Sequence, residues 1–301
     1  MNLDKDHSRI IGEYTNGKDG PLLFISAGVH GNEPSGVLAL QKVFEELNIS
    51  KPKINGAVVG VLGNIKALEK KVRFIDEDLN RTWTKENITK QITDSSEKVE
   101  MFQIIELLKN YPLESYEKRY FLDCHTTSSD SLPYISVQNV NDNYQWAEHF
   151  PTHIIRGFSD IVYGCIDHYL SRTGLTGFVF EGGQHESKSA IMNHEGMIWL
   201  ALKNACSLEF DELSNFPKAI DHLNQFKPQQ KTFEILYRHG LKDEDNFAML
   251  KGYTNFQKLK KGEILALQNG KEIISEWDDY IFMPFYQSQG NDGFFIIREV
   301  K

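Results

Sequence analysis

The sequence predicts an α/β protein: a mixed sheet flanked by helices, followed by a small all-β domain at the C-terminus. Up to about residue 215, short apolar runs of strand length alternate with stretches of helical periodicity. From Lys231 onward the helical period disappears, and turn signals such as Asn269-Gly270 separate short apolar runs. We therefore expect an α/β domain over residues 1–215 and a β-rich domain over residues 216–301.

The elements follow in order from these patterns. Strands are expected at 8–14, 22–27, 56–63, 120–124, 134–138, 177–180, 232–237, 263–267 and 293–297. Helices are expected from about Ser35 and at 96–109, 143–149, 161–170 and 188–208, with a short helical linker between Pro217 and Pro228. In the helix from about Ser35, the stripe expected to face the core is Val37, Leu38, Leu40, Val43, Phe44 and Leu47. In the helix at 96–109, it is Val99, Phe102, Ile105 and Leu108. Residues 64–96 are polar and aperiodic, and a loop this long is usually functional.

Composition restricts the class of protein. The chain has 301 residues, 40% hydrophobic and 25% charged, which is ordinary for a soluble globular protein. A net charge of −9 argues against a nucleic-acid partner. No apolar run is long enough for a membrane span, and residues 1–7 lack a signal-peptide segment. Cys124, Cys165 and Cys206 are scattered, as in reduced proteins, so we expect a cytoplasmic location. A homo-oligomer stays open.

His30 and Glu33 lie in the loop after the apolar run at 22–27, immediately before a helix. This places them at the carboxyl end of a strand, where open α/β sheets bind ligands. An imidazole and a carboxylate three residues apart suit a metal such as zinc. The alternative is a capped helix beside an exposed loop histidine.

Two further strand ends carry polar groups. His125 follows the run at 120–124 and, with His30 and Glu33, completes two histidines and one carboxylate, which leaves a fourth position open as in catalytic zinc sites. The alternative for His125, considered without the other two residues, is a hydrogen-bonded structural histidine. Glu181 ends the run at 177–180, and we interpret it as the base that takes a proton from metal-bound water, with a helix cap as the alternative.

The aperiodic segment supplies Arg73, Asn80 and Arg81. Arg81 could bind a carboxylate through its guanidinium fork, with Asn80 as an additional donor. Arg73 could hold an oxyanion. The alternative is plain surface charge.

Four motifs in this order resemble the succinylglutamate desuccinylase/aspartoacylase family of the zinc carboxypeptidase-like superfamily: Gly28-Val29-His30-Gly31-Asn32-Glu33, Asp78-Leu79-Asn80-Arg81, Asp123-Cys124-His125-Thr126-Thr127 and Phe180-Glu181-Gly182-Gly183. The resemblance implies one Zn²⁺ per chain on His30, Glu33 and His125, with Glu181 as general base. It also implies that Asn80 and Arg81 grip a substrate α-carboxylate and that Arg73 faces the acyl carbonyl. Arg172 is similar to a further substrate-binding arginine of the family, and Tyr286 to a tyrosine that the C-terminal domain adds to the pocket.

The expected function is zinc-dependent hydrolysis of a small N-acyl amino acid at a carbon–nitrogen bond other than a peptide bond. A metallocarboxypeptidase acting on short peptides is the alternative, and a non-catalytic metal- or ligand-binding protein is a rival of another class. Thr126 stands where aspartoacylases carry asparagine, and the residues after Glu181 also depart from them. These positions would line the pocket, so the acyl group stays open.

Overall fold

The computed structural model describes residues 9–17, 19–158 and 160–300, so the expectations for residues 1–8 and for Lys18 in the turn at 16–20 lie outside the described residues. Within these ranges the strands form one large mixed sheet and a smaller antiparallel one. In spatial order the large sheet comprises β1 (Ile10–Thr15), β3 (Ala57–Leu62), β2 (Leu22–Ala27), β4 (Arg119–Thr127), β7 (Leu175–Gln184), β5 (Tyr134–Val137), β6 (His153–Arg156), β8 (Thr232–Gly240), β14 (Asp292–Val300), β13 (Tyr280–Phe282) and β10 (Gln257–Lys258).

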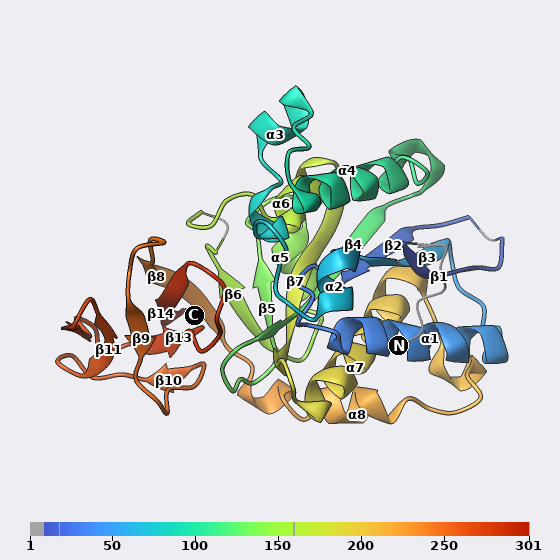
Figure 1. Ribbon diagram of the computed structural model, residues 1–301. Coiled ribbons are helices and arrows are strands. Elements are labelled where there is room, and N and C mark those ends of the chain that lie inside the picture. The colour runs from blue at the N-terminus through green and yellow to red at the C-terminus, as the bar shows by residue number, and fades with distance from the viewer. Residues whose placement is uncertain (1–8, 18, 159, 301) are drawn as a thin grey trace.

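Helices cover both faces of the parallel centre, β3-β2-β4-β7 (Figure 1). The helices of the described residues are α1 (Ser35–Ser50), α2 (Ile65–Lys70), α3 (Lys85–Lys90), α4 (Ser96–Leu108), α5 (Asn143–Ala147), α6 (Ile166–Arg172), α7 (Lys188–Cys206) and α8 (Lys218–Asn224), with 3₁₀ turns at Leu79–Arg81 (η1), Leu113–Ser115, Phe210–Glu212 and Lys227–Gln229. Alternate residues of β2 point to opposite faces: Leu23 and Ile25 pack with α1 and α7, whereas Leu22 and Phe24 pack with α4 and α6. Every residue of β2 and β3 is buried, as expected for parallel strands covered on both sides.

The C-terminal strands extend this sheet. β8 pairs in parallel with β6, and β14, β13 and β10 follow in antiparallel order. The smaller sheet contains β9 (Phe247–Met249), β11 (Ile264–Gln268) and β12 (Lys271–Ile274). Asn269 and Gly270 both have positive φ in the β11–β12 turn, which confirms the predicted hairpin. The α/β fold with a β-rich C-terminal region is confirmed, and the division at residues 215 and 216 stays a prediction.

The structure corrects several element predictions. Residues 64–96 contain α2, η1 and α3, which are too short to show a period but are capped by Asn64, Asp78 and Thr84. β4 and β7 continue past the apolar runs, so His125 and Glu181 lie within strands rather than after them. α6 begins at residue 166 instead of 161, and the short strands β6, β9, β10 and β13 were not predicted.

The predicted core stripes are partly wrong. Leu38 and Val99 are each 36% exposed, whereas Met101 and Ile104 are buried. Residue spacing alone therefore identified the helices α1 and α4 but assigned some residues wrongly to their buried faces. None of the helices in the described ranges combines the length and apolarity that crossing a bilayer requires.

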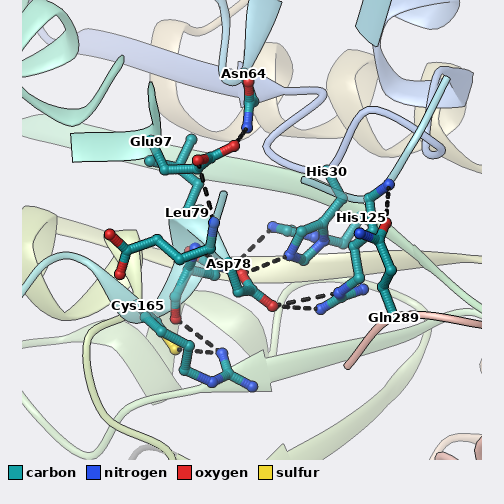
Figure 2. A network of polar contacts seen from close by, with 12 residues as sticks. His30, Asn64, Asp78, Leu79, Glu97, His125, Cys165 and Gln289 are labelled. Carbon is teal, nitrogen blue, oxygen red and sulfur yellow. Dashed lines mark hydrogen bonds and ion pairs between the residues drawn. The ribbon is translucent and has the colours of Figure 1, made fainter. Parts of the chain in front are cut away.

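Glu97 on α4 fixes the segment that leads to the site. Its carboxylate is fully buried and accepts hydrogen bonds from the backbone amides of residues 75, 76 and 77, at 2.7, 3.1 and 3.3 Å. The Asn64 side-chain amide donates a fourth bond at 2.9 Å (Figure 2). A segment with little regular structure is thus held by a single carboxylate that satisfies three consecutive amides.

We predict that Glu97→Ala destabilises the protein by about 2–4 kcal/mol, because it removes the shared acceptor of three partly buried backbone amides and of the buried Asn64 side chain. Glu106→Ala, on the same helix but exposed and paired only with Lys109, should change the free energy of unfolding by less than about 0.5 kcal/mol. Urea unfolding of both variants measures the difference. Equal stability of the two variants would contradict this role of Glu97.

Candidate active site

His30, Glu33 and His125 form the centre of the site. All three are at most 4% exposed, and one potential ligand atom from each lies within 4.8 Å of the others. His30 and Glu33 come from the turn between β2 and α1, and His125 comes from the neighbouring strand β4. Both imidazoles present Nδ1 to Glu33, at 2.9 Å from Oε1 for His30 and 3.1 Å from Oε2 for His125.

This donor set fits a divalent metal ion. Two imidazole nitrogens and a carboxylate oxygen are ligands that zinc takes in proteins. Burial raises the pKa of Glu33, but His30 and His125 outweigh it and hold that pKa well below its usual value. Burial lowers the pKa of His125, yet Asp123 and Glu33 raise it well above the usual value. The group therefore favours positive charge between the carboxylate and the rings, which a bound cation would supply instead of protons.

Carboxylates hold the far nitrogen of each histidine. Asp78 Oδ1 lies 3.0 Å from His30 Nε2, and Asp123 Oδ2 lies 2.8 Å from His125 Nε2 (Figure 2 shows Asp78 pointing toward His30). Asp123 is in turn fixed by Ser26, whose hydroxyl donates to Oδ1 at 2.6 Å. A carboxylate that accepts the Nε2 proton leaves the Nδ1 lone pair free for a metal.

The turn that carries His30 and Glu33 is tightly packed. A side chain at Gly31 would overlap the backbone of Ala67, and the Gly31 amide donates to the carbonyl of Arg73 at 3.2 Å. Glu33 Oε2 also accepts the Thr126 amide at 2.9 Å. The orientation of His30 and Glu33 is therefore set by backbone contacts as well as by side chains.

Glu181 lies beside His125, its register partner on β7. It is 8% exposed, and its Oε2 is buried without a hydrogen-bond partner among the described residues. Burial raises the pKa of Glu181 to about 8, with His125 opposing the rise and Glu33 adding to it. A carboxyl group with a pKa near neutrality can both accept and return a proton, as acid–base catalysis requires. The following glycine serves packing, since a side chain at Gly182 would collide with the His194 ring on α7.

A single cavity is lined by His30, Glu33, His125 and Glu181. Its wall also includes Arg73, Asn80 and Arg81. Arg73 donates to Asp78 Oδ2 from Nη2 at 2.9 Å and from Nε at 3.2 Å, and its Nη1 is 3.5 Å from Glu33 Oε1. Asn80 accepts the Ile166 amide at 3.0 Å.

Arg81 is held by the C-terminal region. Its Nη2 donates to Asp292 Oδ2 at 2.8 Å, and its Nη1 donates to the Asn80 carbonyl at 2.8 Å. Its Nε is buried and has no hydrogen-bond partner among the described residues. Two of the three guanidinium nitrogens are therefore bound by the protein, and the third is enclosed by it.

The structure does not bring Arg172 or Tyr286 to this cavity. Arg172 is exposed in the last turn of α6, because the inward face of that helix carries Asp167 and Ser171. The Tyr286 hydroxyl donates to the Leu250 carbonyl at 2.7 Å and accepts the Tyr253 amide at 3.1 Å, so it is committed within the C-terminal region.

Several cavity residues escaped the sequence analysis. They are Tyr134, Ser136, Phe158, Cys165, Asp167, Val179, Phe282, Met283 and Asp292, whereas Thr126 lines the cavity as expected. His185 contacts the Thr126 hydroxyl and Gln287 at 2.8 and 3.1 Å, and His194 is fully buried against Phe180. These residues reach the site through contacts between segments that are distant in the sequence, and no local sequence pattern indicates them.

A family model described as the succinylglutamate desuccinylase/aspartoacylase catalytic domain matches residues 19–188, more than half of the chain. The chain belongs to the succinylglutamate desuccinylase/aspartoacylase family. The match includes His30, Glu33, Arg73, Asn80, Arg81, His125 and Glu181. It stops before the C-terminal region, which supplies Phe282, Met283 and Asp292 to the cavity.

Curated members of this family align along most of the chain. The succinylglutamate desuccinylase of Pseudoalteromonas atlantica is 22% identical over 280 residues, which cover 87% of this chain and 76% of that protein. The N-acyl-aromatic-L-amino acid amidohydrolase (carboxylate-forming) of Xenopus tropicalis is 26% identical over 275 residues, covering 83% of this chain and 84% of that protein.

Solved structures share the fold. The succinylglutamate desuccinylase of Vibrio cholerae superposes with a TM-score of 0.64 at 17% identity, covering 93% of this chain and 82% of that chain. Murine aminoacylase 3 gives 0.63 at 17% identity, with coverage of 94% and 96%. At this identity the likeness establishes a family fold that includes the C-terminal region.

The Asp123 carboxylate holds Nε2 of His125. Asp123→Asn should weaken zinc binding about 10- to 100-fold, because a neutral amide cannot accept from both Ser26 and His125. Competition titration against a chelating dye measures the affinity. Asp142→Asn, at an exposed site paired with Lys118, is the control and should bind zinc like the unmodified protein. Unchanged affinity in Asp123→Asn would contradict the orienting role.

Proposed function

We propose that this protein is a zinc-dependent amidohydrolase that releases the acyl group from a small N-acyl amino acid. Membership of the family supports hydrolysis of an N-acyl amino acid. The observation that carries the finer proposal is one cavity in which His30, Glu33 and His125 adjoin Glu181 and Arg81. A metal-ligand set, a base and a carboxylate receptor are what such a reaction requires.

The roles follow from position. Zn²⁺ held by His30, Glu33 and His125 would supply Lewis acidity and lower the pKa of a water molecule. Glu181 takes a proton from the attacking water and later gives it to the leaving amine. Arg73, next to Glu33, places positive charge where the acyl oxygen becomes an oxyanion.

Asn80 and Arg81 bind the α-carboxylate of the substrate in this proposal. Arg81 already binds a carboxylate, that of Asp292, which supports its suitability for the task. Arg238 also binds Asp292, so Asp292 keeps a cationic partner when the substrate engages Arg81.

The size and covering of the cavity favour an N-acyl amino acid over a peptide. Its volume is about 70 Å³, with an adjoining space of about 40 Å³ lined by Arg73, His185 and residues of the loop 283–292. The side chains of two glutamines attach that loop to the first domain: Gln287 accepts from Asn32 at 3.3 Å, and Gln289 accepts from the Arg73 amide at 3.1 Å. A metallocarboxypeptidase would need an open groove for the rest of the peptide.

We place the α/β domain at 1–215 and the β-rich domain at 216–301, and we place the protein in the cytoplasm because its three cysteines are free and buried. The oligomeric state stays open.

An amine-release screen tests the function directly. The zinc-loaded protein is assayed against N-acetyl and N-succinyl amino acids and short peptides, and we expect release only from the N-acyl amino acids. Glu181→Gln should keep stoichiometric zinc and lose about 10²- to 10⁴-fold in kcat, because the proton acceptor is gone. Glu186→Gln, an exposed site five residues along the chain, is the matched control.

Three outcomes would count against this proposal. Peptide cleavage would favour the metallocarboxypeptidase. Bound zinc without turnover of any substrate would indicate a binding protein. Full activity of Glu181→Gln would contradict the assignment of the base.

A pair of arginine variants tests the carboxylate receptor. Arg81→Lys should lower kcat/KM about 10- to 100-fold, because lysine keeps the charge but lacks the planar fork. Arg172→Lys should leave kcat/KM unchanged, since the structure places Arg172 on the exposed face of α6. Kinetics on the best substrate of the screen measure both. The reverse order of effects would show that the family's further arginine, not Arg81, serves this site.

A further inference from the structure

Asp167 is a cavity residue that the proposed mechanism does not use. It lies in the first turn of α6, is 7% exposed, and lines the cavity together with Arg81, Ser136 and Glu181. Its Oδ2 accepts a hydrogen bond of 2.7 Å from the Gln138 side chain, which follows β5. The carboxylate therefore has a fixed place on the cavity wall.

The charges around the cavity leave Asp167 without a cationic partner. Arg73 is bound to Asp78 and Glu33, and Arg81 is bound to Asp292. Asp167 makes no ion pair with a lysine or arginine in the part of the chain that the structure describes. Burial raises its pKa, partly offset by the neighbouring His168. A buried carboxylate without a counter-ion is costly, and a cationic ligand would offset that cost.

The position of Asp167 indicates which part of a substrate it would meet. Two residues before it, Cys165 Sγ lies 3.8 Å from Arg81 Nη1, and the intervening Ile166 amide donates to Asn80 Oδ1. Asp167 is thus attached to the segment that contacts the α-carboxylate receptor. A group that reaches Asp167 belongs to the amino-acid half of the substrate, on its side chain.

We propose that Asp167 makes the enzyme selective for N-acyl amino acids whose side chain carries a short cationic amine. This inference rests on the proposed deacylase function. An ammonium group would pair with the carboxylate that Gln138 holds in place, in a charge-assisted hydrogen bond. An anionic side chain would meet Asp167 without any free cation beside it, and an apolar one would leave the carboxylate desolvated and unpaired.

The test uses substrates that differ in one group. Nα-acetyl-L-ornithine and Nα-acetyl-L-norleucine have side chains of equal length, ending in an ammonium and a methyl group, and Nα-acetyl-L-glutamate supplies the anionic case. For the zinc-loaded protein we expect kcat/KM for the ornithine derivative to exceed the other two by about 10- to 100-fold. Asp167→Asn should remove this preference, because the ornithine derivative loses its counter-ion and the norleucine derivative no longer buries an unpaired carboxylate. Asp142→Asn, the exposed control, should keep the preference.

The outcomes separate the two claims. Faster hydrolysis of the norleucine or glutamate derivative would overturn the selectivity while the deacylase function stands. An equal loss for all three substrates in Asp167→Asn would show a structural role instead. No release from any of the three, or from the wider screen, would overturn the deacylase function and this inference with it. Because the ornithine-to-norleucine ratio is measured on the unmodified protein, the selectivity remains testable if Asp167→Asn does not fold.

Discussion

The site depends on one buried carboxylate placed between two imidazoles. Glu33 faces Nδ1 of His30 and of His125, while Asp78 and Asp123 hold the opposite nitrogens. A buried cluster of carboxylates and imidazoles is stable only if every member has a fixed partner. The parallel strands β2 and β4 fix these partners because they end at the same edge of the sheet. The turn at 28–34 and the segment fixed by Glu97 complete the frame.

Much of this could be predicted from the sequence, because the metal-ligand candidates lie directly beside apolar runs. His30, Glu33, His125 and Glu181 each lie within a few residues of a strand core, and strand order brings them together. The alternation of strands and helices likewise predicted the fold. Arg73, Asn80 and Arg81 were identifiable by type, although the short helices around them were not.

The rest of the site depends on contacts that no local pattern contains. Asp292 reaches Arg81 across 211 positions of sequence, and Gln289 reaches Arg73 across 216. Arg172 was proposed only from the family resemblance and Asp167 was not considered, yet helix geometry turns Asp167 inward and Arg172 outward. The C-terminal region thus forms part of the cavity wall, and the first turn of α6 adds a carboxylate to it.

The most direct test of the central claim is a crystal structure of the zinc-loaded protein with anomalous diffraction recorded at the zinc edge. The account predicts one ion per chain, about 2.0–2.2 Å from Nδ1 of His30, Nδ1 of His125 and a Glu33 oxygen, with Glu181 beside it. Asp78 and Asp123 should remain hydrogen-bonded to the two Nε2 atoms. An ion bound elsewhere, or ligated through Nε2, would contradict the account.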